Sequence, residues 1–196
     1  PRHILMTGSG DEKFKGFKSE WATLKGDHMI VGSHGKKPQE EWIKVLDRQY
    51  ALSSIDWREN YQRMRDALAI GPDGYVIHEA SEWHPYRKEW LFFPRKISTE
   101  PFDEPVDERE RGANTLVIAD ENFSNIRTLT IGERVPERGI SSFKVIPGYP
   151  NECVGLKSVE IGDHTETWLF CFNLDGEVLQ EDTLVGRYKC EGVEIL

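Results

Sequence analysis

Short runs of strand-forming residues, each closed by turn residues, fill most of this chain and constrain its fold more than any other feature. Val, Ile, Leu, Thr and aromatic residues cluster in these runs, and Gly, Pro, Asn and Asp separate them, which is typical of strands joined by turns. The sequence therefore predicts an all-β protein, in which 75–96 forms a hairpin of buried aromatic residues. We predict strands at 28–33, 41–47, 75–80, 89–95, 114–120, 126–133, 142–147, 152–158, 167–175 and 177–180.

Two segments depart from the strand pattern. Residues 56–69 predict an amphipathic helix, because Asp56 and Glu59 can form an Asp-x-x-Glu capping box. One face of this helix carries the apolar residues Trp57, Tyr61, Met64 and Leu68. Residues 98–112 contain two prolines and many charges. We predict a loop there, either a solvated excursion or a loop that overhangs a site.

Four oxygen-bearing side chains recur in similar settings, each after a turn and close to a strand: Glu20, Glu79, Ser141 and Glu191. They lie 59, 62 and 50 residues apart. This interval fits one four-stranded blade of a β-propeller with its loops. Because radial symmetry brings one position of each blade to the central axis, these side chains are predicted to converge.

Carboxylates that converge in a buried place repel one another and take up protons unless a cation neutralises them. Three glutamates and one serine offer oxygen atoms alone, which suit a hard cation, and Ca²⁺ accepts six to eight such ligands. We therefore predict a calcium site at Glu20, Glu79, Ser141 and Glu191. The alternative is that the glutamates are ordinary surface or strand-end carboxylates.

Charge and cysteine usage narrow the classes of protein further. The formal net charge of −9 at pH 7 disfavours nucleic acid as a partner, because binding it requires a basic face. The three cysteines lack Cys-x-x-Cys spacing. A symmetric hairpin about Gly162 would place Cys153 opposite Cys171, giving either a disulfide or two buried free thiols.

Several segments, in order along the chain, resemble the calcium-activated nucleotidase (soluble apyrase) family. They are "KGFKSEW", "QEEWIKV", "WRENYQRMRDALAI", "GYVIHEASEW", "WLFFPRK", "DERERGAN", "GISSFKVIPG", "FNLDGEVLQEDTLVG" and "YKCEGVEIL". The resemblance extends over nearly all of residues 14–196 and implies a five-bladed β-propeller. This chain would carry about three blades, so 1–196 would be the C-terminal part of a single propeller domain.

The resemblance also implies one calcium ion near the propeller axis. The family's ligand in "GFKSEW" corresponds to Glu20, in "IHEASEW" to Glu79, in "GISSFK" to Ser141 and in "YKCEG" to Glu191, where Cys190 replaces a more usual aromatic residue. The remaining family ligands belong to blades outside this sequence. The missing blades are therefore an expected partner, and a homodimer is a further alternative.

The activity that the resemblance implies is calcium-dependent hydrolysis of nucleoside di- and triphosphates with release of phosphate. Arg95 in "FFPRK" and Lys18 in "FKSEW" are the expected substrate-binding residues, and no catalytic carboxylate is assigned. The resemblance, together with an Asn-Phe-Ser sequon at Asn122, favours secretion or residence in the lumen of the ER or Golgi.

Two other functions stay compatible with the sequence. One is a non-enzymatic, calcium-stabilised propeller fragment that binds other proteins. The other is a calcium-dependent propeller hydrolase of another substrate, such as a lactone, which would need a catalytic histidine near the ion. His34 and His78 are available for that role. His78 is expected to pack in the fold, because successive side chains of a strand point to opposite faces and Glu79 is its neighbour.

Overall fold

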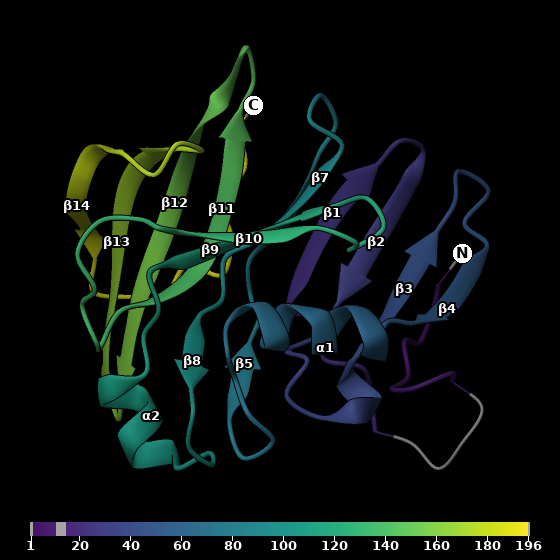
Figure 1. Ribbon diagram of the computed structural model, residues 1–196, viewed down its shortest axis with the longest axis horizontal. Coiled ribbons are helices and arrows are strands. Elements are labelled where there is room, and N and C mark those ends of the chain that lie inside the picture. Colours follow the sequence, from purple (N-terminus) through teal and green to yellow (C-terminus); the bar gives the residue numbers. More distant parts are fainter. Residues whose placement is uncertain (1, 11–14, 196) are drawn as a thin grey trace.

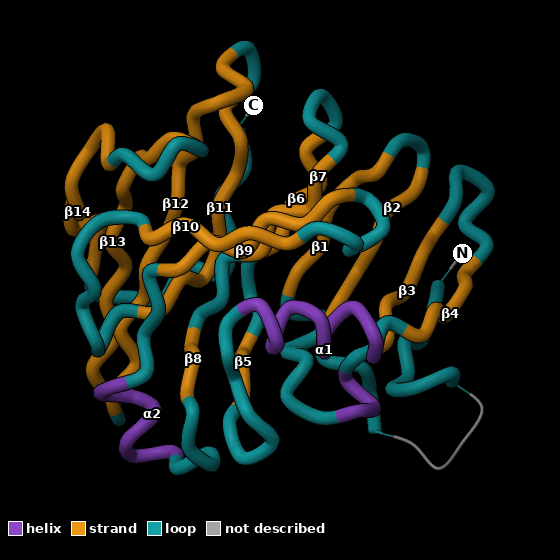
Figure 2. Tube along the Cα trace, viewed as in Figure 1, coloured by secondary structure: helices purple, strands orange, loops and turns teal. Residues whose placement is uncertain are grey.

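Three four-stranded antiparallel sheets make up most of the part of the chain that the computed structural model describes, residues 2–10 and 15–195. The first sheet contains β1 (Trp21–Lys25), β2 (His28–Gly32), β3 (Trp42–Leu46) and β4 (Leu52–Asp56). The second contains β6 (Ser81–His84), β7 (Glu89–Phe92), β9 (Thr115–Asp120) and β10 (Ile126–Thr130). The third contains β11 (Gly139–Ile146), β12 (Tyr149–Ile161), β13 (His164–Asn173) and β14 (Val178–Gly186). The prediction of an all-β protein is confirmed (Figure 2).

Each of the three sheets follows the chain from its first strand to its last. β6 lies between the first strands of the two neighbouring sheets, because it contacts both β1 and β11. A small ribbon of β5 (Tyr75–Ile77) and β8 (Lys96–Ser98) lies below the sheets in Figure 1, on the same side as the two α-helices. The first strands of the three sheets therefore form the centre of the molecule.

The middle sheet is buried on both faces, and the alternation along β7 shows why. Trp90 and Phe92 face the cluster shared with the first sheet, whereas Leu91 and Phe93 face the cluster shared with the third. All four side chains are at most 1% exposed. A strand with period-2 side chains that are apolar on both faces can pack only between two layers.

The predicted helix is confirmed as α1 (Arg58–Ala67), which buries Tyr61 and Met64. The predicted capping box is wrong. Trp57 is the N-cap residue and makes no side-chain capping bond, whereas Asp56 still belongs to β4. The Asp56 carboxylate accepts the backbone N–H of Arg58 at 3.0 Å instead.

The prediction of a loop over 98–112 is wrong in part, because α2 (Glu104–Glu110) forms within it. Pro105 lies in the first turn, where a missing backbone N–H costs nothing. Asp107 is buried and accepts a hydrogen bond from the hydroxyl of Tyr75, which is 32 residues away. This short helix is stabilised by tertiary contacts that a local reading of charges and prolines does not show.

The predicted hairpin 75–96 is divided into two ladders, with Glu79 at the break. β5 pairs with β8, and β6 pairs with β7, so the strands predicted at 75–80 and 89–95 each end early. The carbonyls of Ala80 and Ile77 still accept hydrogen bonds from the backbone N–H groups of Phe93 and Arg95, at 3.0 and 2.8 Å respectively. The carboxylate therefore lies at a bend between two strands rather than inside one.

The β12–β13 hairpin forms, but the symmetric register that would place Cys153 opposite Cys171 is wrong. Of the two alternatives, free thiols are observed, with Cys153 buried and Cys171 partly exposed. Cys153 lies opposite Phe172, and Cys171 lies opposite Val154. The turn at Gly162, which has φ +58°, shifts the register by one residue from the assumed symmetry. A shift of one residue moves a side chain to the other face of the sheet, and all three cysteines are free thiols.

Candidate metal centre

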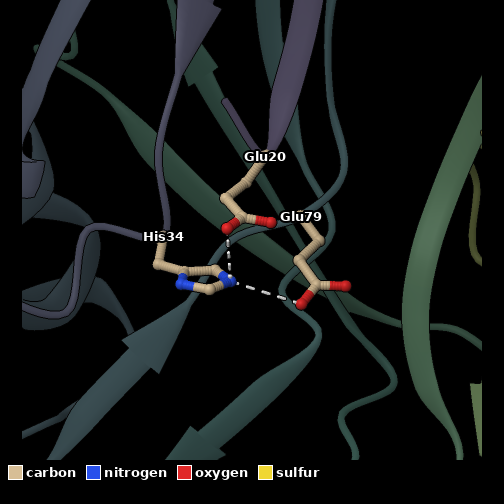
Figure 3. A group of neighbouring side chains, drawn as sticks. All are labelled: Glu20, His34 and Glu79. Atoms are coloured by element: carbon tan, nitrogen blue, oxygen red, sulfur yellow. Dashed lines mark hydrogen bonds and ion pairs between the residues drawn. The ribbon is translucent and has the colours of Figure 1, made fainter. Parts of the chain in front are cut away.

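Two carboxylates that are 59 positions apart in the sequence converge on one imidazole (Figure 3). Glu20 precedes β1, and Glu79 lies between β5 and β6. Their Oε1 atoms lie 3.2 and 3.4 Å from Nε2 of His34. Within the described ranges, these three residues form the group of His, Cys, Asp and Glu side chains whose ligand atoms all lie within 4.8 Å of one another.

Backbone pairing explains why His34 reaches this place. The N–H of Glu20 donates to the carbonyl of Gly32 at 2.9 Å, which continues the β1–β2 ladder by one bond. The carbonyl of His34 accepts the N–H of His78 at 3.0 Å. His34, the second residue after β2, is thereby held between the start of β1 and the bend that carries Glu79.

The centre holds opposite charges close together. Burial lowers the pKa of His34, but hydrogen bonds and attraction to Glu20 and Glu79 outweigh it and raise that pKa to about 9. Burial alone would raise the pKa of Glu79, but the bond to His34 and the positive charges of Arg95 and Lys189 hold it below its usual range. An imidazolium therefore supplies positive charge between the side chains of Glu20 and Glu79.

Arg95 extends the centre toward the third sheet. Its Nη1 donates to Glu79 Oε2 at 3.1 Å and to Ser158 Oγ at 2.6 Å, and its Nη2 donates to Glu160 Oε2 at 2.6 Å. Its side chain is 5% exposed. A Cβ on Gly139 would lie 2.5 Å from Arg95 Cγ, so the glycine makes room for the guanidinium stem.

The ion pairs continue beyond Arg95 to the C-terminal segment. Lys189 Nζ lies 3.1 Å from Glu160 and 3.2 Å from Glu191. At the other end, Lys18 Nζ lies 3.9 Å from Glu20. We call this series of alternating charges the charge chain: Lys18, Glu20, His34, Glu79, Arg95, Glu160, Lys189 and Glu191.

The structure brings together some of the predicted metal ligands and not others. Glu20 and Glu79 share the His34 imidazole. The side chain of Glu191 is 75% exposed and pairs with Lys189, outside that group. Ser141 lies at a register shift of β11 and is 1% exposed, and its Oγ has no hydrogen-bond partner among the described residues.

The predicted substrate-binding residues differ in exposure. Lys18 is 70% exposed beside Glu20, whereas Arg95 is buried among Glu79, Ser158 and Glu160. From the sequence, His34 was considered only as a catalytic histidine. No strand was predicted at β1, so the β1–β2 hairpin that brings His34 near Glu20 was missed.

Two members of the charge chain were missed altogether. Glu160 and Lys189 reach the centre through Arg95, which precedes them by 65 and 94 positions. Their local sequence carries no signal for a contact with a residue so distant.

Lysines gather beside the carboxylate pair. A cavity of about 410 Å³ is lined by His34 and by the lysines Lys18, Lys36, Lys37 and Lys96. A second cavity of about 740 Å³ shares Lys18 and Lys37 with the first. It adds the cationic residues Lys15 and Arg58. A group of oxygen ligands next to clustered cations is suited to binding a polyanion together with a metal ion.

The whole chain, residues 1–196, matches the family model for apyrase. This chain belongs to the apyrase family. None of the helices in the described part of the chain is long and apolar enough to cross a membrane.

Three relatives illustrate the similarity. An apyrase of Cimex lectularius is 36% identical over 208 residues, which cover 100% of this chain and 57% of the relative. The soluble calcium-activated nucleotidase 1 of Rattus norvegicus is 37% identical over 207 residues, which cover 100% and 51%. The apyrase apy-1 of Caenorhabditis elegans is 32% identical over 204 residues, which cover 97% and 57%. This chain therefore spans little more than half the length of these relatives.

Proposed function

We propose that this chain provides a calcium site and part of the substrate site for hydrolysis of nucleoside di- and triphosphates with release of phosphate. The observation that carries the proposal is the convergence of Glu20 and Glu79 next to the lysine-lined cavity. Membership of the apyrase family and similarity to a relative named as calcium-activated support it.

The residues at the centre fit calcium. Glu20 and Glu79 offer hard oxygen donors, and the buried Oγ of Ser141 lacks a partner among the described residues. We propose these three as ligands, with Glu191 joining them once it separates from Lys189. Bound calcium would supply positive charge to the phosphate oxygens. The imidazolium of His34 provides the charge that balances the carboxylates in the present arrangement.

We propose different roles for the two predicted substrate-binding residues. Lys18 is exposed and lines both cavities, so its ammonium can bind a phosphate group. Arg95 is held by Glu79, Ser158 and Glu160. It therefore acts as a positioning residue that fixes the Glu79 carboxylate.

The three sheets are proposed to be consecutive blades of a five-bladed propeller. Their first strands adjoin one another in chain order, as the inner strands of blades do, and the relatives are longer than this chain. The remaining blades would then complete both the sheet stack and the ligand set. We also propose a secretory route, which agrees with exposure of Asn122 in its sequon.

Phosphate release tests this function directly. We expect the wild-type sequence, within a chain that includes the remaining blades, to release phosphate from UDP, GDP or ADP with calcium and not with a calcium chelator. Glu20→Gln should require more calcium for half-maximal release, because it loses one formal charge at the ion. Glu59→Gln is the matched control, since that carboxylate lies on the exposed face of α1 and is 78% exposed. Equal calcium curves for Glu20→Gln and Glu59→Gln would overturn the assignment.

A further inference from the structure

One wall of the cavity beside His34 is acidic and aromatic, whereas the rest of the lining combines four lysines with His34, Glu40 and Ile77. It is formed by the segment that enters α2 and by α2 itself, and its lining residues are Phe102, Glu104, Asp107 and Glu108. We call these four residues the α2 wall. Three carboxylates and an aromatic ring are unsuited to phosphate, which the lysines of the lining would bind instead. The lining thus offers two chemically different kinds of contact to one ligand.

Phe102 presents an aromatic face to this cavity. Its side chain is 45% exposed, although its ring contacts the ring of Tyr75, with centroids 5.6 Å apart and planes inclined at 70°. The ammonium of Lys36 lies 3.4 Å from the centroid of the Phe102 ring. A flexible, half-exposed lysine covers the ring in the same way as a flat ligand would, and it can move aside when such a ligand arrives.

Asp107 presents an acceptor that has no partner. The residue is 2% exposed, and its Oδ1 accepts the hydroxyl of Tyr75. Its Oδ2 is buried and forms no hydrogen bond with any described residue. A buried oxygen without a donor costs free energy that a ligand can recover by donating to it. Tyr75 contacts both Phe102 and Asp107, so it fixes the ring and the acceptor relative to each other.

We propose that Phe102 and Asp107 bind the nucleoside end of the substrate. The base stacks on Phe102, and an N–H or O–H of the nucleoside donates to Asp107 Oδ2. The phosphates lie toward Lys18 and the Glu20–Glu79 pair. The volume of about 410 Å³ is within the range of small-molecule sites. This inference rests on the proposed function and adds residues that distinguish a nucleotide from an inorganic polyphosphate.

The test compares two ligands that differ only in the nucleoside. They are the methylene analogue of GDP, which resists hydrolysis, and methylenediphosphonate, each titrated calorimetrically with calcium present. We expect Phe102→Leu to weaken binding of the GDP analogue about tenfold, in line with the loss of one base–aromatic stack. Binding of methylenediphosphonate should stay within about twofold. Tyr86→Leu is the control, because that ring is 84% exposed in the β6–β7 turn.

A second variant separates recognition from folding. Asp107→Asn keeps an oxygen for the Tyr75 hydroxyl but places an amide N–H₂ where the unpaired acceptor stood. This variant should also weaken binding of the GDP analogue and not binding of methylenediphosphonate. Unchanged affinities in both variants, or equal losses for both ligands, would overturn this inference while the proposed function stands. If the wild type binds neither ligand, both the inference and the proposed function are wrong for this chain.

Discussion

Arg95 is the single residue on which the centre depends most. Its guanidinium neutralises Glu79, whose side chain is 12% exposed, and also reaches Glu160 and Ser158. Removal of one partner from a buried ion pair leaves the other charge desolvated without compensation. Removal of one partner from an ion pair at the exposed ends of the charge chain costs much less stability, because water replaces the missing partner.

We therefore expect Arg95→Met to lower the free energy of unfolding by about 3 kcal/mol, measured by urea denaturation. The matched control is Arg127→Met. Arg127 is 43% exposed and pairs with Glu89, so its loss should cost less than about 1 kcal/mol. The account of Arg95 fails if the two variants are equally stable.

Among the elements, the contact between β6 and β11 contains a half-buried carboxylate. Oε2 of Glu82 accepts the backbone N–H of Val145 at 3.0 Å. Burial raises the pKa of Glu82 to about 7, although Lys144 and the Val145 hydrogen bond oppose the shift and Glu194 adds to it. The folded protein thus holds this proton more tightly than the unfolded chain does.

This contact predicts a pH dependence of stability. The contribution of Glu82 is fully present below the unfolded pKa of about 4.5 and is lost as pH rises through about 7. We expect Glu82→Gln to remove this loss, worth roughly 2 kcal/mol after allowance for partial exposure. The measurement is the melting temperature of both proteins between pH 4.5 and pH 8. Glu59→Gln should keep the wild-type slope, and the same slope in Glu82→Gln would refute the argument.

The elements also show how far the sequence predicts the structure. Ten strands and α1 follow from period and turn chemistry, because those signals are local. α2 does not, since Asp107 is stabilised by Tyr75 across 32 positions. The residue opposite Cys153 depends on the detailed geometry of one turn. A register difference of one residue moves a side chain to the other face of the sheet. Of the site, the spacing indicated Glu20 and Glu79, which lie together, and Glu191, which lies outside their group, whereas Glu160 and Lys189 depend on tertiary contacts.

At the scale of the whole molecule, the charge chain joins the three sheets at their common centre. Glu20 directly precedes β1 of the first sheet, Glu79 precedes β6 of the second, and Glu160 belongs to β12 of the third. The centre therefore forms only when the sheets are correctly placed against one another. A cation that binds Glu20 and Glu79 would bind the folded chain and not the unfolded one, and it would stabilise the fold by mass action.

The shift of the melting temperature with calcium is a direct measure of ion binding at Glu20 and Glu79, and it needs no catalytic activity. We expect the melting temperature of the wild-type chain to rise with calcium concentration. Glu79→Gln should require about tenfold more calcium for the same shift, since Gln keeps the shape of the side chain but removes one charge from the ion's ligands. Glu59→Gln should follow the wild-type curve. A wild-type melting temperature that calcium does not change, or a shift that Glu79→Gln retains in full, would contradict a calcium site at Glu20 and Glu79.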